Sequence, residues 1–157
     1  MFEQISAFFT IEMIYLWLSF GVIPFWFILI FFPQSKICGL LATSIFPFLI
    51  LGSVYVYLII YFFNTDYDFL ENFELYLGIY NLANLFENEA FLILIWTHFL
   101  AINLFCAAWI VRDSQKYFMS KYFNIIPLLI TYFVGPIGIV IYWIIRIFFA
   151  KKISLFD

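Results

Sequence analysis

Charged side chains are scarce in this chain of 157 residues, which has only seven Lys or Arg and ten Asp or Glu. A water-soluble globule of this size needs a polar shell, and so few charged groups cannot form one. The shortage of bases and the net charge of −3 argue against nucleic-acid binding. Intrinsic disorder requires low hydrophobicity, whereas 67% of these residues are apolar. The class that remains is an integral membrane protein.

Residue patterns that mark common chemistries are missing as well. The two cysteines, Cys38 and Cys106, have no motif spacing and predict neither a disulfide nor a metal site. The chain has no zinc-ligand pattern, phosphate-binding loop, dinucleotide fingerprint or Ser-His-Asp order, which argues against conventional hydrolases and kinases. We therefore predict no cofactor and no metal.

Four long apolar segments are present instead, at residues 11–32, 37–63, 90–111 and 125–149. A membrane-spanning helix needs about 20 mostly apolar residues, and each segment reaches that length. The first segment does not read as a cleaved signal peptide, because no Lys or Arg precedes it and no small-residue cleavage site follows it. The sequence predicts an all-α, four-helix transmembrane bundle that forms one integral membrane domain over residues 1–157.

The connection between the second and third segments, residues 64–89, carries six acids and no base. Apolar and aromatic residues recur in it at steps of three and four, which is typical of one face of a helix. We interpret this stretch as an interfacial helix, and a loop that caps the mouth of the bundle is the alternative. The residues of the apolar face are Phe69, Phe73, Tyr76, Leu77 and Tyr80.

The distribution of Lys and Arg favours one orientation of the chain in the membrane, by a difference of one residue between the two sides. Four crossings place both termini and the acidic connection on one side of the membrane, which then carries three bases, against four in the two turns on the other side. Because cytoplasmic loops are richer in Lys and Arg, we expect both termini on the non-cytoplasmic side. The turns contain Lys36, Arg112, Lys116 and Lys121, and the other side contains Arg146, Lys151 and Lys152.

His98 is the only histidine and lies near the middle of the third segment. An imidazole can move a proton near neutral pH, so His98 is a candidate catalytic group. At about 100° per residue, Phe105 and Trp109 lie within about 20° of His98, and Asp113 lies on the same side at the membrane boundary. The alternative is that His98 only hydrogen-bonds a neighbouring helix.

Asn103 points about 140° away from His98 around the same helix, close in angle to Trp96. The helix therefore has two polar and aromatic faces, and either one could line a pocket while the other packs. An amide at this depth is typical of a hydrogen bond between helices.

The fourth segment contains several features that interrupt a regular helix. Pro136 lacks an N–H group, which predicts a kink and a freed carbonyl that needs a partner. Gly135 and Gly138 allow a close approach by a neighbouring helix or by a flat ligand. Tyr142 and Arg146 share one face, and Arg146 either binds an anionic group such as a lipid phosphate or extends to the interface.

Three strings in the second half of the chain resemble a known family. These strings are Trp96-Thr-His-Phe-Leu-Ala, Trp109-Ile-Val-Arg-Asp113 and Val134-Gly-Pro-Ile-Gly. They resemble the abscisic-acid-deficient-four-like family of small four-helix membrane proteins, whose plant members are required to make neoxanthin from violaxanthin. The resemblance covers the C-terminal half well and the first hairpin loosely. The family pattern has an aspartate where this chain has Asn103.

The resemblance implies a carotenoid or another isoprenoid as the substrate. On this hypothesis the chain is a xanthophyll isomerase-type enzyme, or a component of one, in which His98 and Asp113 are catalytic. The predicted substrate-binding residues are Trp96, Asn103, Phe105, Trp109, Gly135, Pro136, Tyr142 and Arg146.

The alternative function is a non-catalytic accessory subunit that binds a lipid, a pigment or a partner membrane protein. The amide at Asn103 and the large aromatic surface favour it. A transporter or channel is disfavoured, because only one ionisable group lies deep in the membrane and four helices rarely enclose a pore. The predicted partners are membrane lipid, a carotenoid or other isoprenoid, and another membrane protein or a second copy of the chain.

Overall fold

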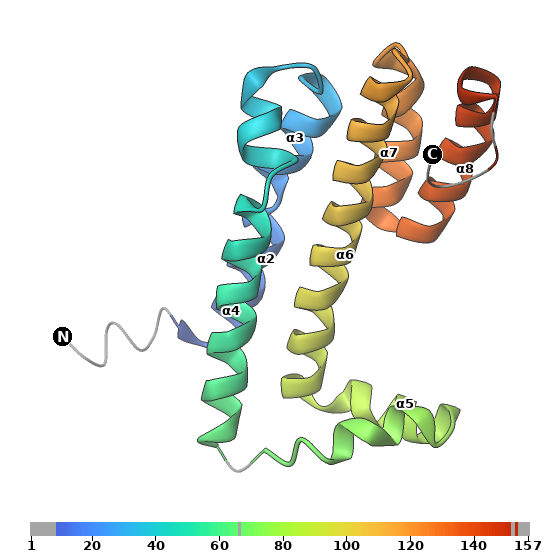
Figure 1. Cartoon of the computed structure of the whole chain (residues 1–157). Coiled ribbons are helices and arrows are strands. Elements are labelled where there is room, and N and C mark those ends of the chain that lie inside the picture. Colours follow the sequence, from blue (N-terminus) through green and yellow to red (C-terminus); the bar gives the residue numbers. More distant parts are fainter. Residues whose placement is uncertain (1–8, 66, 152, 154–157) are drawn as a thin grey trace. The chain divides into compact units, whose positions relative to one another are not determined.

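The computed structural model describes residues 9–65, 67–151 and 153, and within these ranges it contains helices and no strand (Figure 1). The all-α prediction is therefore confirmed. A π-helical segment, Cys38–Ala42, and a 3-10 helix, Glu71–Tyr76, accompany the α-helices. The α-helices are α2 (Ile11–Gly21), α3 (Ile23–Phe31), α4 (Phe46–Phe63), α5 (Ile79–Glu87), α6 (Glu89–Lys116), α7 (Tyr122–Phe133) and α8 (Gly135–Ala150).

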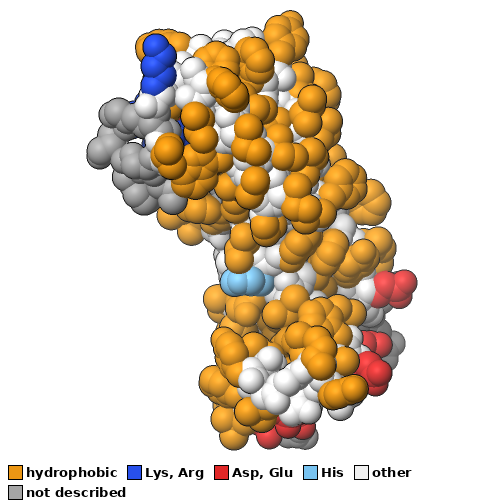
Figure 2. Space-filling model, turned by 90° about the vertical axis from the view of Figure 1, so that its right-hand side faces the viewer, with side chains coloured by type: hydrophobic (Ala, Val, Ile, Leu, Met, Phe, Trp, Pro, Cys, Tyr) orange, Lys and Arg blue, Asp and Glu red, His pale blue; other side chains and the backbone are white. Residues whose placement is uncertain are grey.

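Three helical stretches are long and apolar enough to cross a membrane. They run over Ile11–Phe31, Cys38–Phe63 and Glu89–Lys116, with 21, 26 and 28 residues. They match the first three spans expected from the sequence. Figure 2 shows hydrophobic side chains over much of the surface in view, as expected for helices that face lipid.

The fourth expected span is not one helix, so the four-helix bundle is not confirmed. In place of a kinked helix over residues 125–149, the chain forms α7 and α8, of 12 and 16 residues. Val134 separates them with φ −142° and ψ 83°, which lies outside the helical region. Pro136 falls in the first turn of α8, where its missing N–H costs no hydrogen bond. The proline therefore starts a new helix instead of bending an existing one.

The two short helices pack as a tight hairpin, and they lie side by side in Figure 1. Gly138 makes this approach possible. A Cβ atom at this position would lie 2.5 Å from the backbone nitrogen of Thr131 and 2.7 Å from the carbonyl oxygen of Pro127. Any side chain larger than hydrogen would push the two helices apart.

The chain divides into two compact units. Unit 1 comprises residues 1–21 and 48–100, and unit 2 comprises residues 22–47 and 101–157. The single membrane domain expected from the sequence stays a prediction.

The acidic connection in unit 1 forms two short helices instead of one long interfacial helix. The 3-10 helix Glu71–Tyr76 and α5 are separated at Gly78, whose φ of 141° favours glycine. The apolar face expected there is largely exposed, at 66% for Phe73 and 84% for Tyr80.

Candidate functional site

A buried polar cluster in unit 2 joins the end of α6 to α8. Asp113 Oδ2 accepts hydrogen bonds from Tyr142 Oη and from Arg146 Nε, each at 2.7 Å. Arg146 also donates through Nη2 to Tyr117 Oη at 3.0 Å, and its guanidinium carbon lies 4.8 Å from the centre of the Tyr117 ring. We call these four residues the Asp113 cluster.

Helical spacing brings the Asp113 cluster together. Asp113 and Tyr117 are four residues apart, and so are Tyr142 and Arg146, so each pair shares one face. The close approach of α6 and α8 then brings the two pairs into contact. Tyr142 and Arg146 were expected to share a face, and the structure adds their common partner on α6.

Burial makes this cluster energetically important. The Arg146 side chain is 2% exposed and the Asp113 side chain 9% exposed. A buried charge is tolerated when it is paired and hydrogen-bonded, and removal of one partner costs about 3–5 kcal/mol. Two donors already occupy Asp113 Oδ2, so this carboxylate holds α8 against α6 and orients the Tyr142 hydroxyl.

An aromatic wall borders the cluster. The Trp109 and Tyr142 rings meet edge to face, with centroids 5.7 Å apart. Trp109, Tyr142 and Arg146 were all expected to bind substrate, and the structure brings them together with Asp113 in unit 2.

Asn103 holds the tip of the α7–α8 hairpin. It is 3% exposed, and its Nδ2 donates to the carbonyl oxygen of Tyr132 at 3.4 Å. This carbonyl lies in the last turn of α7, where no donor of the same helix can reach it, and the residue four positions later, Pro136, has no N–H group. A Cβ atom at Gly135 would lie 3.3 Å from Asn103 Cγ and would collide with Oδ1. The contact between helices expected of Asn103 is thus present, and it requires a donor that an ionised aspartate lacks.

The remaining predicted residues lie elsewhere. His98 is exposed on the part of α6 that belongs to unit 1, whereas Asp113 belongs to unit 2. Phe105 is 61% exposed, and Pro136 is exposed at the start of α8. In unit 1, Trp96 donates through its indole N–H to Ser19 Oγ at 3.0 Å. The catalytic and substrate-binding roles of all the predicted site residues, those of the Asp113 cluster included, stay predictions.

Sequence reasoning missed a second polar contact in unit 2. Asn124 Nδ2 donates to Ser114 Oγ at 2.6 Å, and both residues are buried. Tyr117 was missed too, although its spacing of four residues from Asp113 was a usable signal. No such signal linked Asn124 to Ser114, since the two residues lie on different helices, α7 and α6.

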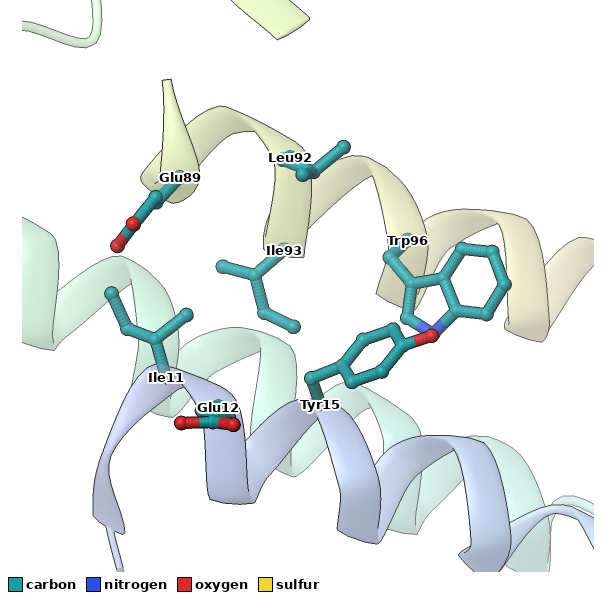
Figure 3. Close-up of a pocket in the computed structure, with 7 residues that line it drawn as sticks. All are labelled: Ile11, Glu12, Tyr15, Glu89, Leu92, Ile93 and Trp96. Atoms are coloured by element: carbon teal, nitrogen blue, oxygen red, sulfur yellow. The ribbon is translucent and has the colours of Figure 1, made fainter. Parts of the chain in front are cut away.

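Unit 1 contains a pocket of about 590 Å³ between α2 and the start of α6. Figure 3 shows Ile11 and Glu89 at one end of it and the rings of Tyr15 and Trp96 at the other. Those two rings have centroids 5.6 Å apart. Of the predicted site residues, this pocket includes Trp96, and its other lining residues are Ile11, Glu12, Tyr15, Glu89, Leu92 and Ile93.

Metal ligands do not gather in the described part of the chain. Among residues 9–65, 67–151 and 153, no group of three or more His, Cys, Asp or Glu side chains is placed to hold a metal ion.

Among the described residues the chain forms helices and no strand, and three helical stretches are long and apolar enough to cross a membrane. These observations define its class as an all-α protein with helices of membrane-spanning length. A family model described as ABA DEFICIENT 4-like matches residues 13–142, and the chain belongs to this family. The chloroplastic protein ABA DEFICIENT 4 of Arabidopsis thaliana is 28% identical over 105 residues, which are 61% of this chain and 44% of the plant protein. The match thus spans less than half of that relative. No solved structure matches the chain significantly.

Proposed function

We propose that this chain is an integral membrane protein that binds a carotenoid or a related isoprenoid and isomerises it. The observation that carries the proposal is the family match over residues 13–142. Three helices of membrane-spanning length support it, because a polyene of this kind dissolves in the bilayer and reaches the protein through lipid.

The reaction proposed is the opening of a xanthophyll epoxide to an allene. One proton leaves the carbon next to the ring, the C–O bond breaks, and a proton reaches the former epoxide oxygen, so substrate and product are isomers. Such a step needs a group that can accept and return a proton. His98 is that group in our proposal, because its exposed imidazole is accessible to a substrate that arrives through lipid.

The Asp113 cluster has a different role in this proposal. Its carboxylate is already bonded to two donors, so it positions Tyr142 and Trp109 rather than moving the proton. The rigid edge-to-face pair then forms part of an apolar wall against the substrate.

A non-catalytic accessory role is the second candidate, and Asn103 favours it. The family pattern has an aspartate there, and in this chain the amide donates to the Tyr132 carbonyl. If the aspartate carries catalysis in relatives, this chain keeps the binding surface without the chemistry.

Expression in a bacterium engineered to accumulate violaxanthin separates these functions. We expect a neoxanthin-like product by chromatography, lost in His98→Ala and retained in Ile102→Ala, a control at an exposed position on the same helix. An unchanged pigment profile with the pigment co-purifying favours the accessory role. An unchanged profile without pigment in the purified, folded protein contradicts the enzyme and the pigment-binding form of the accessory role.

A further inference from the structure

The α7–α8 hairpin is too short to cross a membrane twice. At about 1.5 Å per residue, its 12- and 16-residue helices reach roughly 18 and 24 Å, against about 30 Å of hydrocarbon. The non-helical backbone at Val134 can lie at membrane depth only where protein buries it and supplies its hydrogen bonds. Val134 donates to the Ile130 carbonyl and accepts from the Ile137 and Gly138 N–H groups, and Asn103 from α6 donates to the neighbouring Tyr132 carbonyl.

Contacts with α6 define how deep the hairpin reaches. Its tip lies at Asn103, and its last turns lie at Asp113, where Arg146 pairs. Those two α6 residues are about 15 Å apart along the helix axis. The hairpin therefore follows α6 for about half of the hydrocarbon thickness and returns to the end where it started.

Because the hairpin returns to the end where it started, it changes which basic residues lie on the same side of the membrane. In four crossings, Arg146 and Lys151 would lie on the side opposite to Arg112 and Lys116. In the structure, Arg146 instead contacts Asp113, which directly follows Arg112. The turn that carries Lys36 lies at the same end, because Gln115 Nε2 donates to the Pro33 carbonyl.

Exposed bases form a surface at this end of unit 2. We call it the basic surface; its members are Lys36, Arg112, Lys116, Lys121 and Lys151, all of which are exposed. Phe118 is 96% exposed beside it, and a hollow of about 450 Å³ opens between Lys36, Ser35 and Gln115. Exposed aromatic rings and bases together are typical of the headgroup region of a bilayer.

We propose that α7–α8 is a re-entrant hairpin and that the basic surface rests on the anionic headgroups of the cytoplasmic leaflet. The chain then crosses the membrane three times, with the start of α2 outside and the end of α8 in the cytoplasm. All of the described bases lie on the cytoplasmic side, which agrees with the positive-inside rule far better than a division of four against three. This inference does not depend on the proposed function.

Labelling of single cysteines tests the hairpin. In a background with Cys38→Ala and Cys106→Ala, we place one reporter at a time: Ser120→Cys before α7, Lys151→Cys after α8, or Glu74→Cys in the acidic connection. A membrane-impermeant maleimide should label Glu74→Cys in intact cells, and the other two only after permeabilisation. Labelling of Ser120→Cys and Lys151→Cys from opposite sides overturns the hairpin, and labelling of both from outside overturns the cytoplasmic assignment.

A fluorescent protein fused after Asp157 gives a second measurement, in a chain that carries no substitutions. It should fluoresce, because this reporter matures in the cytoplasm and not after export. A dark fusion at normal expression level contradicts the cytoplasmic end of α8.

Lipid retention tests the occupant of the basic surface. Native mass spectrometry of protein released from mixed phosphatidylglycerol and phosphatidylcholine bilayers should show phosphatidylglycerol retained preferentially. The triple variant Lys36→Gln, Lys121→Gln, Lys151→Gln should lose most of this preference, since each base strengthens binding roughly fivefold. The matched triple variant Glu71→Gln, Glu74→Gln, Glu87→Gln should keep it. Equal preference in both triple variants overturns the proposed lipid contact.

Discussion

The two units of this molecule differ in how they use polar residues. All seven Lys and Arg fall in the sequence of unit 2, whereas eight of the ten acids fall in unit 1, which has no base. Unit 2 also contains five of the six buried polar side chains among the described residues, and unit 1 contains only Thr97. Unit 2 is therefore held by specific polar pairs, and unit 1 by apolar and aromatic packing.

This difference has a physical cause in the backbone. The membrane-length part of unit 1 consists of α2, most of α4 and the first part of α6, whose backbone hydrogen bonds are satisfied within each helix, so packing suffices there. Unit 2 includes a helix break at Val134 and a chain reversal, and these need partners from side chains. Substitutions in unit 2 should consequently cost more stability than comparable ones in unit 1.

The largest effect is expected in the Asp113 cluster. Arg146→Met leaves Asp113 buried without its cation and should reduce the free energy of unfolding by about 3–5 kcal/mol. Thermal unfolding in detergent measures this, with Glu12→Gln at an exposed position of unit 1 as the control. The double variant Arg146→Met, Asp113→Leu should recover at least half of the loss. If single and double variants unfold alike, the ion pair is not what stabilises this contact.

A smaller effect is expected where the hairpin helices touch. Gly138→Ala would collide with Thr131 and should destabilise by about 1–3 kcal/mol. Gly52→Ala is the matched change in α4, where nothing lies within 4 Å of the added Cβ, and should stabilise by roughly 0.5–1 kcal/mol. Opposite shifts of the unfolding temperature are expected, and equal shifts would show that the hairpin is looser than described.

The amide that holds the hairpin tip should tolerate little change. Asn103→Asp removes the donor to the Tyr132 carbonyl and should cost about 1–3 kcal/mol. The loss should shrink at low pH, where a protonated carboxyl can donate again. A loss that is independent of pH would mean that the Asn103 donor is not the feature that matters.

The smallest effect is expected for the hydrogen bond between Ser19 and Trp96 in unit 1. Ser19→Ala should cost about 0.6 kcal/mol, the average for hydrogen bonds between membrane helices. The unfolding temperature measures it beside Ser114→Ala, which removes the acceptor for Asn124 in unit 2 and should cost more. Equal losses of stability in Ser19→Ala and Ser114→Ala would contradict the expected difference between unit 1 and unit 2.

Parts of the candidate site were predictable from spacing on one helix. The shared face of Tyr142 and Arg146 follows from the step of four residues, and Trp109 with Asp113 follows from the step along α6. Which helix faces which was not predictable, because helix periodicity says nothing of the partner. The pairing of Arg146 with Asp113 and of Asn124 with Ser114 depends on which helices face each other, so periodicity could not predict it.

The sequence by itself determined the helical class and the first three stretches that can cross a membrane, because these depend on local length and residue type. It also indicated the family, through the three residue strings in its second half. Only the tertiary structure decided the fate of the last apolar segment. A proline after a glycine is compatible with a kink or with a break, and the sequence favoured the kink. Asn103 at the Tyr132 carbonyl and Gly138 against Thr131 stabilise the break, and both are contacts between side chains or backbone of different helices, which local sequence does not specify.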